Sequence, residues 1–287
     1  MPTSNFPHLV ETDWLEAHLD DPNIRILDCT TFLRASEDGY YMESGLGLWK
    51  KAHIPGSVFA DLSTDLSDQD NSIQFMIPPA DKFAQAMSRL GIRDDTFVVL
   101  YDSFINIWAA RVWWMLRSFG FEKAAILNGG WKKWKREKRP ITTETADRPK
   151  GELVVHPNAG MIASKEDVLK AIDNPEIILI DALTRQEYSG EMAVYGRPGH
   201  IPSSINIPAI ELIDRRTRSY LPVEKLEEIL EPILKKEPSG IITYCGGGAA
   251  GSSVAFALKL LGVENVSVYD GALIEWASDP ELPMVTS

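Results

Sequence analysis

Residues 239–262 decide the fold, and they read SGIITYCGGGAAGSSVAFALKLLG. The first part is a β-branched run that ends at Cys245, and a continuous apolar run of this length is typical of a buried parallel strand. Three glycines follow, and then a segment with a helical pattern that ends at Gly262, a residue at which helices commonly stop. Strands that alternate with helices predict a parallel sheet covered on both faces, so this stretch indicates an α/β protein.

The same pattern occurs twice along the chain. Each half holds three β-branched runs, which are, in order, 23–29, 96–102 and 123–129, and then 176–182, 239–245 and 265–271. The motif His-Ile-Pro at His53 recurs at His200, and the helical segment 109–120 matches 251–262. We therefore predict two homologous α/β domains, each a parallel sheet flanked by helices. Their expected extents are 1–142 and 161–287, joined by a polar linker at 143–160.

Composition excludes several classes of protein. The chain has 287 residues, 44% of them hydrophobic, and a net charge of −12, so a nucleic-acid binder and a disordered chain are both disfavoured. No apolar run is long enough to span a bilayer and no secretory signal is visible, so we expect no membrane partner and a cytoplasmic location. Two cysteines, Cys29 and Cys245, cannot form a disulfide framework or a multi-cysteine zinc site.

The two halves differ at one chemically important place. After the middle strand the first half has Asp102, whereas the second half has Cys245 followed by three glycines. The glycines let the backbone curl so that several N–H groups point into one concavity, and the next helix adds its positive end. Both features favour a thiolate and lower a cysteine pKa. Cys245 is therefore the candidate nucleophile, and the alternative is a buried, inert cysteine before a glycine-rich turn.

Other functions of this loop fit less well. The run 246–251 matches a dinucleotide fingerprint on paper, but no ribose-binding acid follows the next strand convincingly. A nucleotide-binding Walker loop needs a lysine before its Ser or Thr, and Gly251 stands there. A cysteine phosphatase needs a loop arginine to hold the phosphoryl group, and 245–258 contains none.

Taken together, several motifs resemble the tandem-domain rhodaneses, a family of sulfurtransferases that includes the thiosulfate and 3-mercaptopyruvate sulfurtransferases. The resemblance covers nearly the whole chain. It is carried by the two His-Ile-Pro motifs, Ala-Arg-Val-Trp-Trp-Met at 110–115, Asn-Gly-Gly-Trp at 128–131, the Cys245 loop, and Tyr-Asp-Gly…Glu-Trp at 269–276.

The resemblance implies a ping-pong cycle. Cys245 takes a sulfane sulfur from a small anionic donor, becomes a persulfide, and passes the sulfur to cyanide, a thiol or a thioredoxin-like protein. The loop that would hold the sulfur consists of Gly246, Gly247, Gly248, Ala249 and Ala250. No metal or organic cofactor is implied. The first domain is expected to be catalytically silent, with Asp102 at the nucleophile position, and to supply a wall of the cleft between the domains.

The sequence indicates the identity of the sulfur donor less clearly than that of the nucleophile. The uncharged loop resembles the mercaptopyruvate branch, although Gly247 stands where that branch has a hydroxyl residue. That branch grips the donor carboxylate with two arginines. Arg197 fits one position approximately and Arg185 lies two residues from the other, and for each the alternative is a solvated surface arginine. His53 is either a cleft residue, as its counterpart is in that branch, or a structural histidine.

We therefore interpret the chain as a two-domain sulfurtransferase with Cys245 as its nucleophile and thiosulfate or 3-mercaptopyruvate as its donor. A non-catalytic binding or sulfur-carrier protein of the same fold is the main alternative. A cysteine phosphatase is a weaker one.

Overall fold

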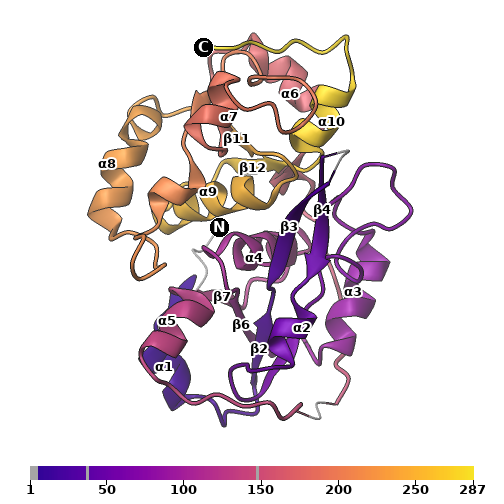
Figure 1. Cartoon of the computed structure of the whole chain (residues 1–287), viewed down its shortest axis with the longest axis vertical. Coiled ribbons are helices and arrows are strands. Elements are labelled where there is room, and N and C mark those ends of the chain that lie inside the picture. Colours follow the sequence, from indigo (N-terminus) through magenta and orange to yellow (C-terminus); the bar gives the residue numbers. More distant parts are fainter. Residues whose placement is uncertain (1–5, 37–38, 147–148) are drawn as a thin grey trace.

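The computed structural model describes residues 6–36, 39–146 and 149–287, and within them two five-stranded parallel sheets have the same strand order (Figure 1). The first sheet runs β1 (Leu9–Val10), β7 (Ala124–Leu127), β6 (Phe97–Tyr101), β2 (Ile24–Asp28) and β5 (Ser57–Phe59). The second runs β8 (Ile162–Ala163), β12 (Val266–Tyr269), β11 (Gly240–Tyr244), β9 (Ile177–Asp181) and β10 (Ile205–Asn206). The six strands predicted from the β-branched runs are all present. The predicted pair of homologous α/β domains is confirmed.

Helices flank both sheets. Those of the first domain are α1 (Thr12–Ala17), α2 (Leu46–Trp49), α3 (Ala80–Arg89), α4 (Ile107–Ser118) and α5 (Gly130–Arg136). Those of the second are α6 (Lys165–Ile172), α7 (Arg185–Ser189), α8 (Val223–Leu234), α9 (Ala249–Leu260) and α10 (Ala272–Ser278), with short 3₁₀ turns η1 (Ala159–Met161) and η2 (Ala209–Leu212). Both α4 and α9 begin two residues earlier than predicted. Each is followed by a glycine in the left-handed conformation, Gly120 with φ 83° and Gly262 with φ 79°.

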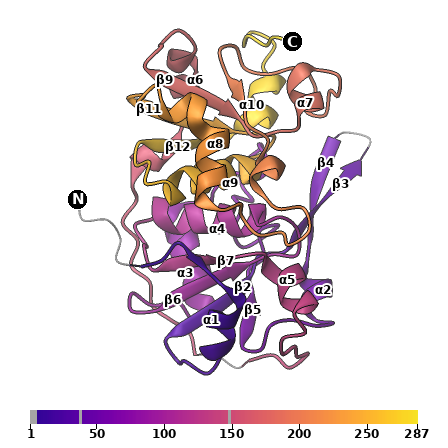
Figure 2. The same cartoon turned by 90° about the vertical axis from the view of Figure 1, so that its left-hand side faces the viewer.

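Helices α4 and α9 pack against each other across the boundary between the domains, and they lie side by side between the two sheets (Figure 2). Trp113 of α4 meets Phe256 of α9 edge-on, with ring centroids 4.9 Å apart, and both side chains are fully buried. One cluster of buried apolar side chains therefore continues from the first domain into the second. The aromatic residues around Trp113 thus pack in the core and the domain interface.

Two segments of the first domain extend toward the second. The antiparallel strands β3 (Thr31–Ser36) and β4 (Gly39–Ser44) form a two-stranded arm that reaches alongside the second domain (Figure 1). The segment before α3 also crosses over, since the backbone N–H of Ile77 donates to the Asp270 carboxylate at 2.8 Å. The β-branched pattern of the sequence did not indicate either arm, and both contribute to the site.

The predicted linker behaves as an irregular connection over the residues described. Between 143 and 158, the structure shows no helix or strand in the residues it describes, 143–146 and 149–158. Across the described ranges, no helix is both long enough and apolar enough to pass through a membrane.

Candidate active site

Cys245 lies at the end of β11, where the chain turns into α9. Strand β11 is the central strand of its sheet, and the side chain of Cys245 is only 3% exposed. The Thr243 hydroxyl donates to the Gly251 carbonyl at 2.9 Å, which ties the first turn of α9 to the strand. Two further hydrogen bonds hold the loop from the other side, from Leu273 N–H to the Cys245 carbonyl and from Ile274 N–H to the Gly246 carbonyl. The sulfur is therefore fixed at a rigid corner.

The three glycines after Cys245 are needed for different reasons. Only Gly248 has a positive φ, 81°, and it precedes the first residue of α9. At Gly246 a Cβ would lie 2.0 Å from the ring of Tyr195, and at Gly247 it would lie 2.7 Å from the ring of Phe75. The expected curl of the backbone therefore depends on one glycine. The other two are small because aromatic side chains press against the loop.

Two opposing effects determine the pKa of the Cys245 thiol. Burial raises the pKa of the Cys245 thiol above its ordinary value, while the backbone N–H groups of Gly251, Gly247 and Ala250 face the sulfur and lower its pKa. Burial is the larger effect, so the lowered pKa predicted from the loop alone is wrong. The N–H groups still place partial positive charge where a sulfur anion would develop.

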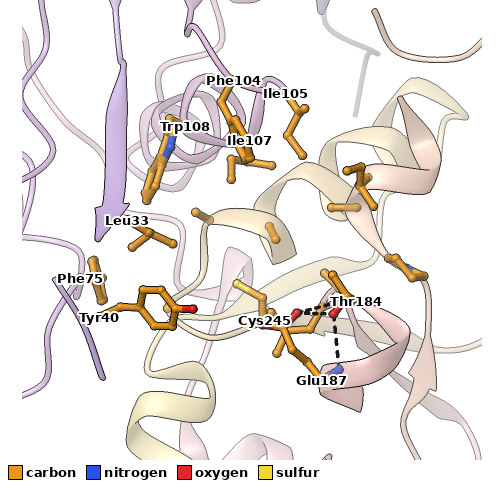
Figure 3. A pocket seen from close by; sticks show the side chains of 18 of the residues that line it. Leu33, Tyr40, Phe75, Phe104, Ile105, Ile107, Trp108, Thr184, Glu187 and Cys245 are labelled. Carbon is orange, nitrogen blue, oxygen red and sulfur yellow. Dashed lines mark hydrogen bonds between the residues drawn. The ribbon is translucent and has the colours of Figure 1, made fainter. Parts of the chain in front are cut away.

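A cavity of about 290 Å³ opens in front of Cys245 (Figure 3). It lies between the domains, and both contribute side chains to it. The first domain supplies Leu33, Tyr40, Phe75, Phe104, Ile105, Ile107 and Trp108. The second supplies Ala182, Leu183, Thr184, Glu187, Tyr195, Pro208, Ala209, Ile210, Cys245, Gly247, Ala249, Ala250 and Ile274. In Figure 3 the Tyr40 hydroxyl is turned toward Cys245. Of the five predicted loop residues, Gly247, Ala249 and Ala250 line the cavity.

The two predicted donor-binding arginines do not line this cavity. The guanidinium of Arg197 donates to four backbone carbonyls, those of Trp276, Ala277, Asp279 and Leu282, at 2.8–3.1 Å. It therefore caps the C-terminal end of α10, where carbonyls lack helical partners. Arg185 is exposed and forms a two-point ion pair with Glu211 at 2.6 and 2.8 Å. The expectation that they grip a donor is corrected: one is a structural clamp and the other a surface ion pair.

His53 is also held away from the cavity. Its ring is fully buried, stacks on Trp49, and makes hydrogen bonds to the carbonyls of Trp49 and Glu144 at 2.7 and 3.1 Å. His200, the equivalent residue of the second domain, stacks on Tyr188 and bonds its carbonyl at 2.7 Å. The repeated motif thus builds the same local packing twice. The structural interpretation of His53 replaces the interpretation as a cleft residue.

One residue that sequence reasoning missed is Arg111 of α4. Its side chain is 2% exposed, and its Nη2 donates to the Phe75 carbonyl at 2.8 Å and to the Asp270 carboxylate. A Cβ at Gly248 would lie 2.6 Å from its Nη1, so this arginine of the first domain packs against the loop of the second. The available signal was an arginine in the middle of an otherwise apolar run, 109–115, because a buried charge requires a partner.

Two aromatic residues and a carboxyl group complete the surroundings of the sulfur. The rings of Tyr40 and Tyr195 have centroids 6.3 Å apart and stand beside the loop. Burial raises the pKa of Asp181, at the end of β9, to about 7, and the Leu183 N–H, which donates to it at 2.8 Å, opposes that rise. Among the described residues, no group of three or more His, Cys, Asp or Glu side chains is arranged to hold a metal ion.

Comparison with known proteins finds a domain pattern that matches both halves of the chain and proteins that are similar over nearly its whole length. The sequence pattern of the rhodanese-like domain matches the chain twice, over residues 11–137 and 164–279. The chain is 34% identical over 278 residues to the 3-mercaptopyruvate sulfurtransferase of Escherichia coli (strain K12), and the match covers 96% of each protein. It is 32% identical to the sulfur carrier protein TtuD of Thermus thermophilus, over 96% of this chain and 95% of that one.

A solved structure agrees with the sequence comparison. The crystal structure of SseA from Escherichia coli matches this structure with a TM-score of 0.80 at 34% identity. The match covers 92% of this chain and 98% of that one.

Proposed function

Because this chain belongs to the rhodanese-like family and is a sulfurtransferase, we propose that Cys245 is its nucleophile and carries the sulfur as a persulfide. We propose thiosulfate or 3-mercaptopyruvate as the donor, which is the kind of small anionic compound for which the relatives are named. The observation that carries the proposal is the position of Cys245: it lines the cavity between the domains and faces three backbone N–H groups. A thiol, cyanide or a thioredoxin-like protein is the acceptor.

The first step forms one S–S bond and breaks one bond in the donor. The Cys245 thiolate attacks the outer sulfur of thiosulfate or the thiol sulfur of 3-mercaptopyruvate. The electron pair of the broken S–S or C–S bond leaves with sulfite or with the enolate of pyruvate, and the enolate takes up the thiol proton. The persulfide then carries negative charge on its outer sulfur. The N–H groups of Gly247, Ala250 and Gly251 supply fixed dipoles for that charge, and they need no rearrangement because the loop is already rigid.

The first domain serves as a wall of the site in this proposal. Its matching corner carries Asp102, which has no sulfur chemistry. Its arms and its α4 corner line one side of the cavity. We retain 1–142 and 161–287 as the proposed domains, with 143–160 as the linker.

The main alternative is a sulfur carrier that takes up sulfur but does not turn over rapidly. The raised pKa of Cys245 favours this alternative, since a thiol that ionises late is a slow nucleophile, and one relative is named a sulfur carrier protein. Turnover with a small acceptor separates the two functions. We also propose a cytoplasmic location without nucleic-acid or membrane partners. It is supported by the two free cysteines and the net charge of −12.

Intact mass spectrometry tests the persulfide. The protein is incubated briefly with thiosulfate or with 3-mercaptopyruvate, and its mass is compared with that of Cys245→Ser. We expect a gain of one sulfur atom in the wild type and none in the variant, and the faster donor identifies the branch. Cys29→Ala is the matched control, because Cys29 is the only other cysteine of the chain and is completely buried away from the cavity. No gain from either donor would refute the proposed donors.

A further inference from the structure

The cavity in front of Cys245 is lined almost entirely by apolar side chains. Five aromatic rings face it, those of Tyr40, Phe75, Phe104, Trp108 and Tyr195, and aliphatic side chains fill the spaces between them. At about 290 Å³ it is at the small end of the range for small-molecule sites. Since an apolar cavity of about 150 Å³ can hold benzene, this space has room for one aromatic ring together with the chain that carries a thiol.

The cavity offers no cation to a charged substrate. Among the described residues that line it there is no lysine, arginine or histidine, and Glu187 is the only charged side chain. The Glu187 carboxylate already accepts hydrogen bonds from the Thr184 N–H and hydroxyl, at 3.0 and 2.6 Å. An anionic group that entered the apolar part of this cavity would lose its hydration without gaining a partner, so the small anionic donors of the proposed first step must bind at the loop N–H groups beside the sulfur.

The arginines near the cavity do not supply the positive charge that its lining lacks. Arg185 is paired with Glu211, Arg111 is paired with Asp270, and Arg197 binds backbone carbonyls. The guanidinium groups of Arg185 and Arg197 are therefore engaged outside the cavity lining. Nη1 of Arg111 has no hydrogen-bond partner among the described residues, but it lies behind the loop at Gly248 and does not line the cavity. The loop N–H groups stabilise charge at the sulfur of Cys245 itself, but they do not reach the far wall formed by the first domain.

Apolar side chains also continue to the rim of the cavity. Leu33, Phe104 and Ile210 line it and remain 41%, 48% and 37% exposed, which is high for large hydrophobic residues. They come from the β3 strand, the loop before α4, and η2, so they lie on three separate elements. An apolar substrate that entered here would cover these three side chains as it reached the sulfur.

We propose that the acceptor in the second half of the reaction is an uncharged organic thiol that carries an apolar group about the size of one aromatic ring. This inference rests on the proposed Cys245 persulfide. The acceptor's thiolate attacks the outer sulfur, and the S–S bond of the enzyme breaks with its electron pair returning to Sγ of Cys245. The acceptor leaves as an organic persulfide, its thiol proton passes to the released Cys245 thiolate, and no outside oxidant or reductant is needed.

The test begins from persulfide that is already formed, so it does not depend on the donor. Protein loaded with inorganic polysulfide, and checked by intact mass, is mixed with 2-phenylethanethiol, 2-mercaptoethanol or 3-mercaptopropanoate. Each rate of sulfur loss is divided by the rate at which the same thiol removes sulfur from glutathione persulfide. We expect this ratio to be at least about tenfold higher for 2-phenylethanethiol than for 2-mercaptoethanol, and lowest for the carboxylate. Equal ratios, or a carboxylate that is fastest, would overturn the inference.

Two variants separate the cavity from general effects of charge. Ile210→Arg places a cation at the rim and is expected to raise the ratio for 3-mercaptopropanoate above that for 2-mercaptoethanol. Leu169→Arg is the matched control, because Leu169 is equally exposed at 37% but lies on α6 outside the cavity lining, and it should leave the order unchanged. If polysulfide adds no sulfur to Cys245, the proposed persulfide itself fails. If sulfur is added and both arginine variants behave alike, only the acceptor inference fails.

Discussion

The corner that carries Asp102 and the corner that carries Cys245 are the same strand–loop–helix unit built twice, and each surrounds a side chain with backbone N–H groups. In the first domain the Asp102 carboxylate accepts four of them. Phe104 and Asn106 donate to Oδ1 at 2.8 and 3.1 Å, and Trp108 and Ala109 donate to Oδ2 at 3.0 and 3.1 Å. The first corner thus fills its own ring of N–H groups with a carboxyl group. Burial raises the pKa of Asp102, and these four N–H groups oppose that rise.

The second corner is shorter and lined by smaller residues. The left-handed residue before the helix comes four positions after Asp102, at Asn106, but three positions after Cys245, at Gly248. The shorter side chain of Cys245 leaves space in front of the sulfur, and the bulky residues of the first loop, among them Phe104 and Trp108, form the opposite wall of that space. The difference indicates that the duplicated unit serves structure at the first corner, while the second corner leaves space for the chemistry that we propose for Cys245.

The largest expected effects come from replacing each of the two central side chains in turn. Cys245→Ala should lower the rate of sulfur loading by at least about 10³-fold and change the free energy of unfolding by only about 1–2 kcal/mol. Asp102→Asn should do the opposite: it leaves N–H donors poorly paired, lowers the free energy of unfolding by about 2–4 kcal/mol, and preserves loading per folded molecule. Urea denaturation and intact mass measure both. An Asp102→Asn protein of unchanged stability would refute the structural role of the first corner.

The second test concerns the glycine that closes the shorter loop. Gly248→Ala adds a Cβ at φ 81° and only 2.6 Å from the Arg111 guanidinium, so we expect loading to fall roughly 100-fold because the loop N–H groups shift from the sulfur. Gly262→Ala is the control, since its φ is 79° but nothing lies within 4 Å of the added atom. It should cost about 1 kcal/mol of stability and leave loading unchanged. Equal losses in both variants would show that backbone strain alone is responsible.

The third test compares the carboxyl groups at the ends of β2 and β9. Burial raises the pKa of Asp28 to about 6 and that of Asp181 to about 7, although each accepts a backbone N–H at 2.8 Å. Both pKa values lie above that of the unfolded chain, 3.8, so the folded state binds the protons more tightly. Stability therefore falls as the pH rises from about 4 to about 6 for Asp28, and from about 4 to about 7 for Asp181.

Replacement of each carboxyl group by an amide checks this sign. At pH 8, Asp181→Asn should raise the free energy of unfolding by on the order of 2–4 kcal/mol, and Asp28→Asn by about 1–3 kcal/mol, because a tenfold change in proton affinity corresponds to about 1.4 kcal/mol. At pH 4 both variants should match the wild type within about 1 kcal/mol. Thermal unfolding across this pH range provides the measurement. Variants that lose stability at pH 8 would contradict it.

The smallest expected effect is that of Arg185→Ala. Its ion pair with Glu211 is exposed to solvent, so its loss should change the free energy of unfolding by less than about 0.5 kcal/mol. The KM for thiosulfate or 3-mercaptopyruvate should stay the same, since Arg185 does not line the cavity. A tenfold rise in KM would instead support the prediction from the sequence that Arg185 binds the donor. It would show that donor binding at the second corner depends on this positive charge.

Much of this organisation follows from short-range patterns in the sequence. The β-branched runs correspond to β2, β6, β7, β9, β11 and β12, and the glycines at 120 and 262 end α4 and α9, because strand propensity and helix termination depend on neighbouring residues. Those patterns also placed Cys245 and Asp102 at equivalent corners. The sequence patterns indicated less clearly the extra residue in the loop after Asp102 and the short strands at the edges of the sheets, β1, β5, β8 and β10.

Only the tertiary structure decided what surrounds the sulfur. Tyr40, Phe75 and Arg111 reach the Cys245 loop from sequence positions more than 130 residues away, and no local pattern encodes a contact between such distant segments. Burial likewise reversed the expected direction of the Cys245 pKa, because desolvation depends on everything that packs around a group. Arg197 illustrates the same limit: its place in the sequence suggested substrate, whereas the fold directs its guanidinium to the end of α10.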